Sequence, residues 1–185
     1  KLSDAVALHL IAEKSNVTYY LEEQGDSYQL YAYTLGQEPQ FIAERITYVE
    51  QMPNGKDVLY CAMRMEDNPI SKIIEDDITD ITKYDEERQA VIEEMRAKMK
   101  EEENMDPIFQ DCYIVTASGN RKVHDTVVSA ASIPGESGFL VGYSMEEPAP
   151  LKLSEINSFD EALYAYYSNL MYGQYEVFIA DKGGN

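Results

Sequence analysis

The chain has 185 residues, of which 44% are hydrophobic and 11% aromatic, so it can bury a core and is not disordered as a whole. The 15 Lys and Arg residues stand against 34 Asp and Glu residues, which leaves a formal net charge of −19. This excess opposes binding to phosphate backbones and anionic membrane surfaces, so we expect no nucleic-acid partner. Every apolar run is shorter than the ~20 residues of a membrane-spanning helix, and Lys1-Leu2-Ser3-Asp4 is not a signal peptide. We therefore expect a soluble segment without direct membrane insertion.

The first 67 residues predict a short helix followed by a four-stranded antiparallel meander. Ser3 fits the N-cap of a helix from Asp4 to Lys14. Four runs rich in β-branched and aromatic residues follow, and each break between them contains a glycine. These runs are Val17–Leu21, Tyr28–Tyr33, Phe41–Val49 and Val58–Met63. Asn54-Gly55 is the strongest hairpin signal, because both residues tolerate positive φ.

Residues 68–106 predict two helices. Asn68-Pro69 fits the start of the first helix, and isoleucines then recur with the 3.6-residue period of one helical face. They are Ile70, Ile73, Ile74, Ile78 and Ile81. The second helix is expected from Tyr84 to Glu103, with one side formed by Tyr84, Val91, Ile92, Met95 and Met99. We expect this side to pack on the helix's own domain; the alternative is a partner-binding or coiled-coil helix.

The remaining residues predict a second meander and a partial third unit. Three strands are expected at Cys112–Ala117, Val123–Ala130 and Gly138–Tyr143. Ser158 and Glu161 then form a capping-box pattern, which predicts a helix from Phe159 to Leu170. Tyr175–Ala180 is the last expected strand.

Short internal similarities indicate a repeat. Lys1-Leu2-Ser3-Asp4 recurs as Lys152-Leu153-Ser154-Glu155, and a weaker third copy begins near Lys72. Tyr19-Tyr20-Leu21 corresponds to Val177-Phe178-Ile179 in this scheme. The predicted fold class is α+β: antiparallel β-meander sheets from repeated helix-plus-strands units, with a two-helix insertion in the middle. The expected parts are 1–67, 68–106, 107–150 and 151–185, and we expect them to belong to a longer array.

Residues 28–60 resemble the blade pattern of TolB-like bacterial β-propellers, especially repeats of unknown function in large cell-envelope proteins of Gram-positive bacteria. The matching stretches are Leu30-Tyr31-Ala32-Tyr33, Phe41-Ile42-Ala43, Ile46, and Asn54-Gly55-Lys56-Asp57-Val58-Leu59-Tyr60. The resemblance implies an extracytoplasmic, non-catalytic sheet module. The helix expected in every unit departs from the pattern, and the chain is too short to close a ring of four or more blades.

The sequence contains no motif for catalysis or for a cofactor. His9, expected in a helix, and His124, expected in a strand, have no motif-level nucleophile, and no phosphate-binding loop occurs. Cys61 and Cys112 are too few for a zinc site; we expect two buried thiols, with a single bridge between them as the alternative. The acidic cluster Glu75-Asp76-Asp77 with Asp80 lacks the spacing of a calcium loop, so we interpret it as a solvated helical face. No metal is expected.

Tyrosine is frequent, with 15 residues in a chain that has no tryptophan. Tyr31 and Tyr33 on one strand, with Tyr164 and Tyr167 on one helix, are the candidate surface for a glycan or peptide. The alternative is that these tyrosines occupy half-buried sheet faces and helix–sheet contacts.

The function predicted from these observations is a non-catalytic extracytoplasmic interaction or spacer module of a larger envelope protein, anchored to the membrane through another part of that protein. A carboxylate-dependent hydrolase or carbohydrate-processing domain and a calcium-binding adhesion domain are the alternatives, and the cytoplasm is the alternative compartment. The expected partner is a protein or a glycan. Self-association through the strand Tyr175–Ala180 is a further expectation, because the edge of that strand must be covered.

Overall fold

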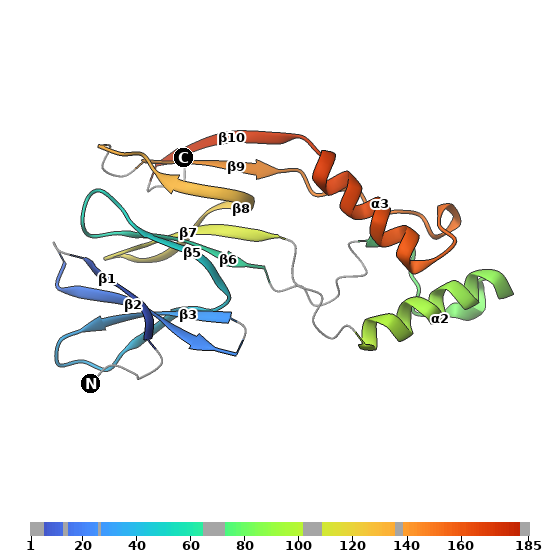
Figure 1. The fold of residues 1–185 in the computed structure, drawn as a ribbon, viewed down its shortest axis with the longest axis horizontal. Coiled ribbons are helices and arrows are strands. Elements are labelled where there is room, and N and C mark those ends of the chain that lie inside the picture. The colour runs from blue at the N-terminus through green and yellow to red at the C-terminus, as the bar shows by residue number, and fades with distance from the viewer. Residues whose placement is uncertain are drawn as a thin grey trace. The chain divides into compact units, whose positions relative to one another are not determined.

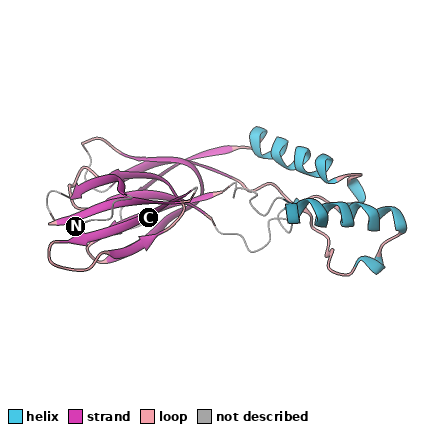
Figure 2. Ribbon diagram, turned by 60° about the horizontal axis from the view of Figure 1, so that its bottom comes forward, coloured by secondary structure: helices cyan, strands magenta, loops and turns pink. Residues whose placement is uncertain are grey.

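The computed structural model describes residues 6–12, 15–25, 27–64, 73–101, 109–135 and 139–181. The chain divides into two compact units, each built from separate stretches of sequence. The strand unit comprises Lys1–Arg64, Ile108–Met145 and Tyr175–Asn185, and the helical unit comprises Met65–Pro107 and Glu146–Gln174. The strands belong to the first unit and the helices to the second (Figures 1 and 2).

Two antiparallel sheets form the strand unit. The four-stranded sheet has the order β1-β2-β3-β4, and the six-stranded sheet has the order β10-β9-β8-β7-β6-β5. Consecutive strands are therefore neighbours within each sheet. The bounds are β1 Val6–Ala12, β2 Val17–Gln24, β3 Ser27–Thr34, β4 Gln40–Ala43, β5 Ile46–Gln51, β6 Val58–Met63, β7 Gln110–Thr116, β8 Gly119–Ser132, β9 Phe139–Met145 and β10 Tyr175–Asp181.

The helix expected from Asp4 to Lys14 is wrong, because residues 6–12 form β1. This strand pairs with β2 in a hairpin that matches Leu10 with Tyr19 and Ala12 with Val17. Asn16, with φ of 54°, turns the chain back between the two strands. Pairing with β2 and packing of Leu10 on the sheet core outweigh the local helix preference. Ser3, the expected cap, lies outside the described residues.

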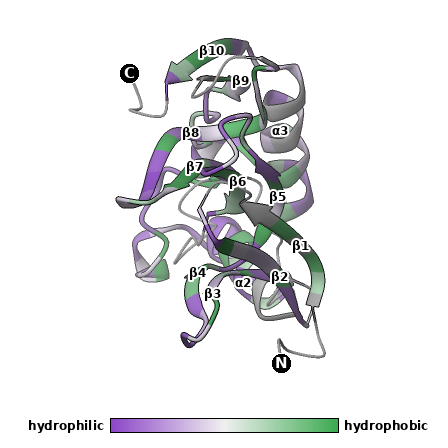
Figure 3. Ribbon diagram, turned by 90° about the vertical axis from the view of Figure 1, so that its left-hand side faces the viewer, coloured by the Kyte–Doolittle hydropathy of each residue, from purple (hydrophilic) through white to green (hydrophobic). Residues whose placement is uncertain are grey.

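The single strand expected from Phe41 to Val49 is two strands in two sheets. Arg45 has φ of 55°, a left-handed conformation that interrupts the strand, so β4 ends before it and β5 begins after it. The predicted four-stranded meander therefore divides between the two sheets. Buried side chains of both sheets form one core, which consists of Tyr19, Leu21, Leu30, Ile46, Val58, Tyr60, Ala62 and Val115. Hydrophobic stretches follow strands of both sheets (Figure 3).

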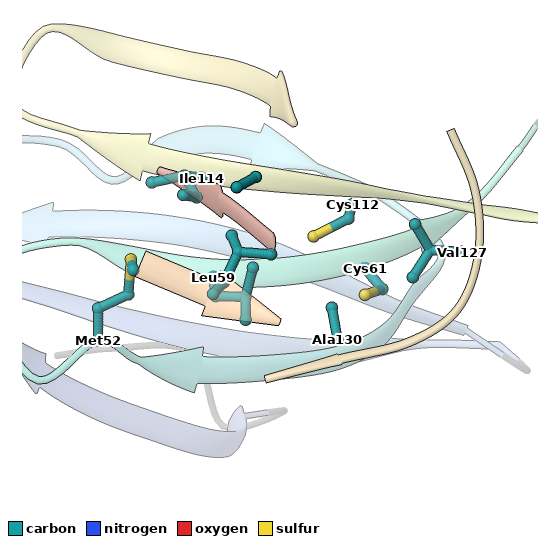
Figure 4. Close-up of a cluster of buried hydrophobic side chains, with 9 residues drawn as sticks. Met52, Leu59, Cys61, Cys112, Ile114, Val127 and Ala130 are labelled. Atoms are coloured by element: carbon teal, nitrogen blue, oxygen red, sulfur yellow. The ribbon is translucent and has the colours of Figure 1, made fainter. Parts of the chain in front are cut away.

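A second core involves alternate residues of β6 and β7. Leu59 and Cys61 alternate with Val58 and Tyr60 along β6, so the two sets point to opposite faces. The second core consists of Met52, Leu59, Cys61, Cys112, Ile114, Val127, Ala130, Leu140 and Ala180 (Figure 4). Strand β8 makes this arrangement possible, since its first part pairs with β7 and its last part with β9. The switch of pairing partner from β7 to β9 occurs beside Thr126, whose φ is 52°.

The helical unit contains α2 (Glu86–Glu101), α3 (Phe159–Tyr172) and two short 3₁₀ helices, η1 (Ile81–Lys83) and η2 (Leu153–Glu155). Both α-helices lie where they were expected, although α2 begins at Glu86 and so does not include Tyr84. On α2, Val91, Ile92 and Met95 are buried, as predicted, whereas the Met99 side chain lies outside the described part. The Ser158 hydroxyl accepts a bond of 3.2 Å from the Glu161 amide. This bond confirms the half of the capping box that the Ser158 side chain forms.

The first isoleucine helix is wrong from residue 74 onward. Ile74 forms a parallel bridge with Leu151, and the amide of Glu75 donates to the Leu151 carbonyl at 2.8 Å. The acidic cluster is consequently not a helical face. Asp77 accepts bonds from the amide and hydroxyl of Thr79 at 3.0 and 2.6 Å, and Asp80 accepts corresponding bonds from Thr82. Such turns compete with helical backbone bonding. Asn68-Pro69 lies outside the described residues.

The predicted fold class of repeated helix-plus-strands units is therefore overturned. The strand with Tyr19-Tyr20-Leu21 is β2, an inner strand of the four-stranded sheet that follows another strand. The strand with Val177-Phe178-Ile179 is β10, an edge strand of the six-stranded sheet that follows α3. The two places are not equivalent. The chain is mainly antiparallel β-sheet, and no described helix has both the length and the apolar character needed to cross a membrane.

Candidate functional site

A groove of about 420 Å³ opens in the strand unit, and it is the candidate functional site. One wall belongs to the four-stranded sheet, where Tyr19 of β2 and Thr34 of β3 line it. The β3–β4 hairpin and β4 extend this wall, chiefly through Gln37, Glu38, Gln40 and Phe41. The opposite wall is the β7–β8 hairpin, which contributes Thr116, Ser118 and Asn120. Two hairpins distant in sequence therefore frame the groove.

The polar groups in this groove are mostly uncharged. Hydroxyls come from threonine, serine and tyrosine, and amides come from glutamine and asparagine. Glu38 is the single carboxylate among the lining residues, and none of the lining residues is basic. A ligand with a phosphate or carboxylate group would find no cation in this lining. The groove thus fits a neutral ligand rich in hydrogen-bonding groups.

Hydrogen bonds fix the β7–β8 wall of the groove. The hydroxyls of Thr116 and Ser118 are 2.7 Å apart, and the Ser118 amide donates to the Thr116 hydroxyl at 3.2 Å. The Asn120 side-chain amide donates to the Tyr60 hydroxyl at 2.7 Å. The ring of Tyr60 in turn stacks on Tyr113, with centroids 5.0 Å apart. These contacts hold the hairpin against the central strands before any ligand arrives.

Two buried tyrosines near the groove keep their protons at neutral pH. Burial raises the pKa of Tyr60 to about 12, although the bond from Asn120 acts in the opposite direction. Burial also raises the pKa of Tyr19, with a smaller contribution from the charge of Asp57. Neither phenol is thus poised to act as a general base near pH 7.

Tyr31 and Tyr33 lie on β3, and Tyr31 belongs to an aromatic row that crosses three strands. Tyr31 stacks on Tyr20 of β2 with centroids 5.3 Å apart and meets Phe41 of β4 edge to face at 5.7 Å. The Tyr31 hydroxyl donates to the side-chain oxygen of Gln29 at 2.6 Å. Phe41 connects this row to the groove, because it also lines the groove and is 51% exposed.

Tyr164 and Tyr167 lie on α3 in the helical unit. The Tyr164 side chain is 78% exposed, whereas the Tyr167 side chain lies outside the described part. The candidate tyrosines are thus divided between two units. A common surface formed by all four tyrosines stays a prediction.

None of the four candidate tyrosines lines the groove, and the sequence analysis named none of the residues that do line it as site residues. Ser118 and Asn120 lie between the expected strands Cys112–Ala117 and Val123–Ala130, and Gln37 and Glu38 lie between the expected strands Tyr28–Tyr33 and Phe41–Val49. The sequence marks both stretches as turns, which is also the usual location of binding residues. The sequence does not indicate that the two turns lie near each other. Their proximity depends on the chain passing from one sheet to the other at Arg45.

Several residues considered for catalysis or metal binding have structural partners. His124 stacks on Phe178 with ring centroids 4.0 Å apart, and its Nδ1 is 2.7 Å from the Asp125 carbonyl oxygen. His9, expected in a helix, is in β1 and pairs with Tyr20 in register. Lys83 lies 3.8 Å from Asp77 and 3.9 Å from Asp80. Within the described ranges, no group of three or more His, Cys, Asp or Glu residues is placed to hold a metal ion.

The strand Tyr175–Ala180 is paired within the chain as β10. It joins β9 in antiparallel register, which matches Val177 with Tyr143 and Ile179 with Val141. Because β10 is the last strand of its sheet, its other backbone edge has no strand partner among the described residues. Tyr175, Val177 and Ile179 all point outward, with exposures of 49%, 64% and 65%. Self-association through this strand stays a prediction.

Val177→Lys tests this self-association. The Val177 side chain is already exposed, so the substitution should change the free energy of unfolding of a monomer by no more than about 0.5 kcal/mol. If copies pair through β10, the added lysines repel each other and the dimer should dissociate. Light scattering at several concentrations measures this shift. If the native chain and the Val177→Lys variant have the same molecular mass in solution, self-association through β10 is contradicted.

No protein-family model matches this chain, and no curated protein matches it. Two solved structures are similar in part. The first is the β-propeller domain of the Trilobed protease from Pyrococcus furiosus, described as having an open velcro topology, with 11% identity and a TM-score of 0.43; the match covers 92% of this chain and 37% of that chain. The second is an acylaminoacyl peptidase in complex with Z-Gly-Gly-Phe-chloromethyl ketone, with 11% identity and a TM-score of 0.40. This match covers 81% of this chain and 22% of that chain. We draw no function from similarities this remote.

Proposed function

We propose that this chain is a non-catalytic interaction module of a larger extracytoplasmic envelope protein, and that its groove binds a neutral glycan. The observation that carries the proposal is the lining of the groove. Hydroxyl and amide side chains face a space of about 420 Å³ between two hairpins, and no basic residue lines it. This volume is in the range of small-molecule sites.

The side chains of the groove match the chemistry of a sugar ring. Each sugar hydroxyl both donates and accepts hydrogen bonds, as do the amides of Gln37, Gln40 and Asn120 and the hydroxyls of Thr34 and Ser118. The apolar face of a sugar ring requires a flat apolar partner, and Phe41 offers an exposed ring at the edge of the groove. Glu38 adds one strong acceptor for a sugar hydroxyl.

One further feature supports the interaction role over the hydrolase alternative. Glycoside hydrolysis generally requires two carboxylates across the scissile bond, and Glu38 is the single carboxylate in the lining. The net charge of −19 also keeps the module from adhering to anionic polymers. The extracytoplasmic location rests on the resemblance of residues 28–60 to propeller blades of envelope proteins.

Binding of chitohexaose, a neutral N-acetylglucosamine hexamer, tests the proposal by isothermal titration calorimetry. We expect a measurable Kd for the native chain and at least a tenfold weaker Kd for Phe41→Ala, since a lost stacking contact of about 1.4 kcal/mol corresponds to a factor of ten. A cellohexaose titration shows whether the N-acetyl group contributes.

Tyr143→Ala is the matched control. Tyr143 has the same 51% exposure as Phe41 but lies on β9 and does not line the groove. Its removal should leave Kd unchanged. If neither oligosaccharide binds the native chain, or if both alanine variants weaken binding equally, the groove is not the glycan site.

A further inference from the structure

Cys61 and Cys112 face each other across β6 and β7. The antiparallel register of these strands makes the two residues direct partners, between the pairs Tyr60–Tyr113 and Ala62–Asp111. Partners in antiparallel strands point to the same face of the sheet. Both side chains accordingly belong to the second core, where Figure 4 shows them with Leu59, Val127 and Ala130. In this structure both cysteines are thiols.

The register places the two residues within reach of a disulfide. Direct partners in an antiparallel pair have Cα atoms about 4.5 or 5.5 Å apart, depending on their hydrogen bonding. Disulfides span Cα distances of about 4.4–6.8 Å. A bond between the sulfurs thus needs no change of register. Strand β7 is also locally irregular at this point, because its pairing with β8 shifts on both sides of Cys112.

The two thiols interact with each other. A side-chain hydrogen bond with Cys112 lowers the pKa of Cys61, although burial acts against it. The same hydrogen bond and burial raise the pKa of Cys112. The two sulfurs are thus in hydrogen-bonding contact within the core.

We propose that Cys61 and Cys112 are a redox pair, which closes into a cross-strand disulfide when the chain meets a disulfide oxidant. The thiolate of one cysteine attacks one sulfur of the oxidant, forms a mixed disulfide and releases the first thiolate. The thiolate of the other cysteine then attacks the sulfur of the first and releases the second thiolate of the oxidant. Two protein thiols lose two electrons and two protons, and one oxidant disulfide becomes two thiols.

The bond has a defined place in the chain. The segment Met65–Pro107 of the helical unit follows β6 and precedes β7, so a Cys61–Cys112 bond closes the loop that contains it. Closing a long loop restricts the unfolded chain, which stabilises the folded one. Both cysteines are buried in the folded chain, so the oxidant reaches them during folding or on local opening.

Refolding of the native chain in glutathione disulfide tests the proposal. We expect a product lighter by two hydrogens, in which neither cysteine reacts with iodoacetamide in denaturant. We also expect its urea midpoint to exceed that of the reduced chain. Glutathione that remains bound to the native chain, disulfide-linked dimers, or two alkylated cysteines after refolding would each overturn the proposal.

Cys61→Ala and Cys112→Ala separate the bond from effects on the core. Each single variant should retain glutathione on its remaining cysteine and show no increase in midpoint on oxidation. Circular dichroism of the reduced variants establishes that they fold. If either variant gains as much stability on oxidation as the native chain, the increase does not come from this bond. The readout is independent of glycan binding, so the two proposals can fail separately.

Discussion

Met95→Glu is expected to destabilise the chain by about 2–4 kcal/mol, because it places a carboxylate in the core of the helical unit. Met95 has no exposed surface in α2, and Val91 and Ile92 on the same helix are buried with it. The new carboxylate must stay desolvated, take up a proton or force the helix from its place. Urea unfolding followed by circular dichroism measures the loss.

Ala97→Glu is the matched control on the same helix. Ala97 is exposed, so the same new side chain remains in water there and the free energy of unfolding should change by no more than about 0.5 kcal/mol. An equal, small effect of both substitutions would show that the Met95 face does not stabilise the isolated chain. In that case the alternative of a partner-binding helix is favoured.

Most strands were predictable because their apolar residues alternate or run together between turn residues. The strand expected at Val58–Met63 has the same bounds in the structure, and Asn54-Gly55 lies in the turn before it. Asn54 Oδ1 accepts bonds from the amides of Lys56 and Asp57, which fixes this turn. Helix α3 was equally predictable, since its cap requires only residues that are close in sequence.

The errors occurred where distant residues determine the local structure. The stretch Val6–Ala12 contains good helix formers, and its strand depends on pairing with β2. Ile74 continues a helical period, yet the backbone groups on either side of it, the Ile73 carbonyl and the Glu75 amide, bond to Leu151. Arg45 has no residue-specific preference for positive φ, so the change of sheet could not be predicted. The groove depends on that change, and for this reason the sequence predicted its residues only as parts of separate strands and turns.

Asp111 forms a buried charge network at the β8 bend. Its carboxylate accepts a bond of 3.1 Å from the Thr126 amide and lies 3.4 Å from both Arg64 Nε and Lys122 Nζ. Arg64 also donates to the Thr126 hydroxyl at 2.7 Å and lies over the ring of Phe109 at 5.5 Å. These bonds hold Thr126 in its left-handed conformation, which is unfavourable for a β-branched residue.

Asp111→Ala should therefore destabilise the strand unit by about 2–4 kcal/mol. Removing one partner of a buried ion pair costs about 3–5 kcal/mol, and the partial exposure of Arg64 and Lys122, at 25% and 47%, reduces this value. Asp125→Ala is the matched control, because Asp125 pairs with the same lysine but is 63% exposed. Its loss should cost no more than about 1 kcal/mol.

Urea unfolding gives both values, and hydrogen exchange at the Thr126 amide should accelerate more in Asp111→Ala than in Asp125→Ala. Equal stability of the two variants would show that Asp111 does not hold the bend, and the strained backbone at Thr126 would then have to be maintained by packing of Val127 in the second core.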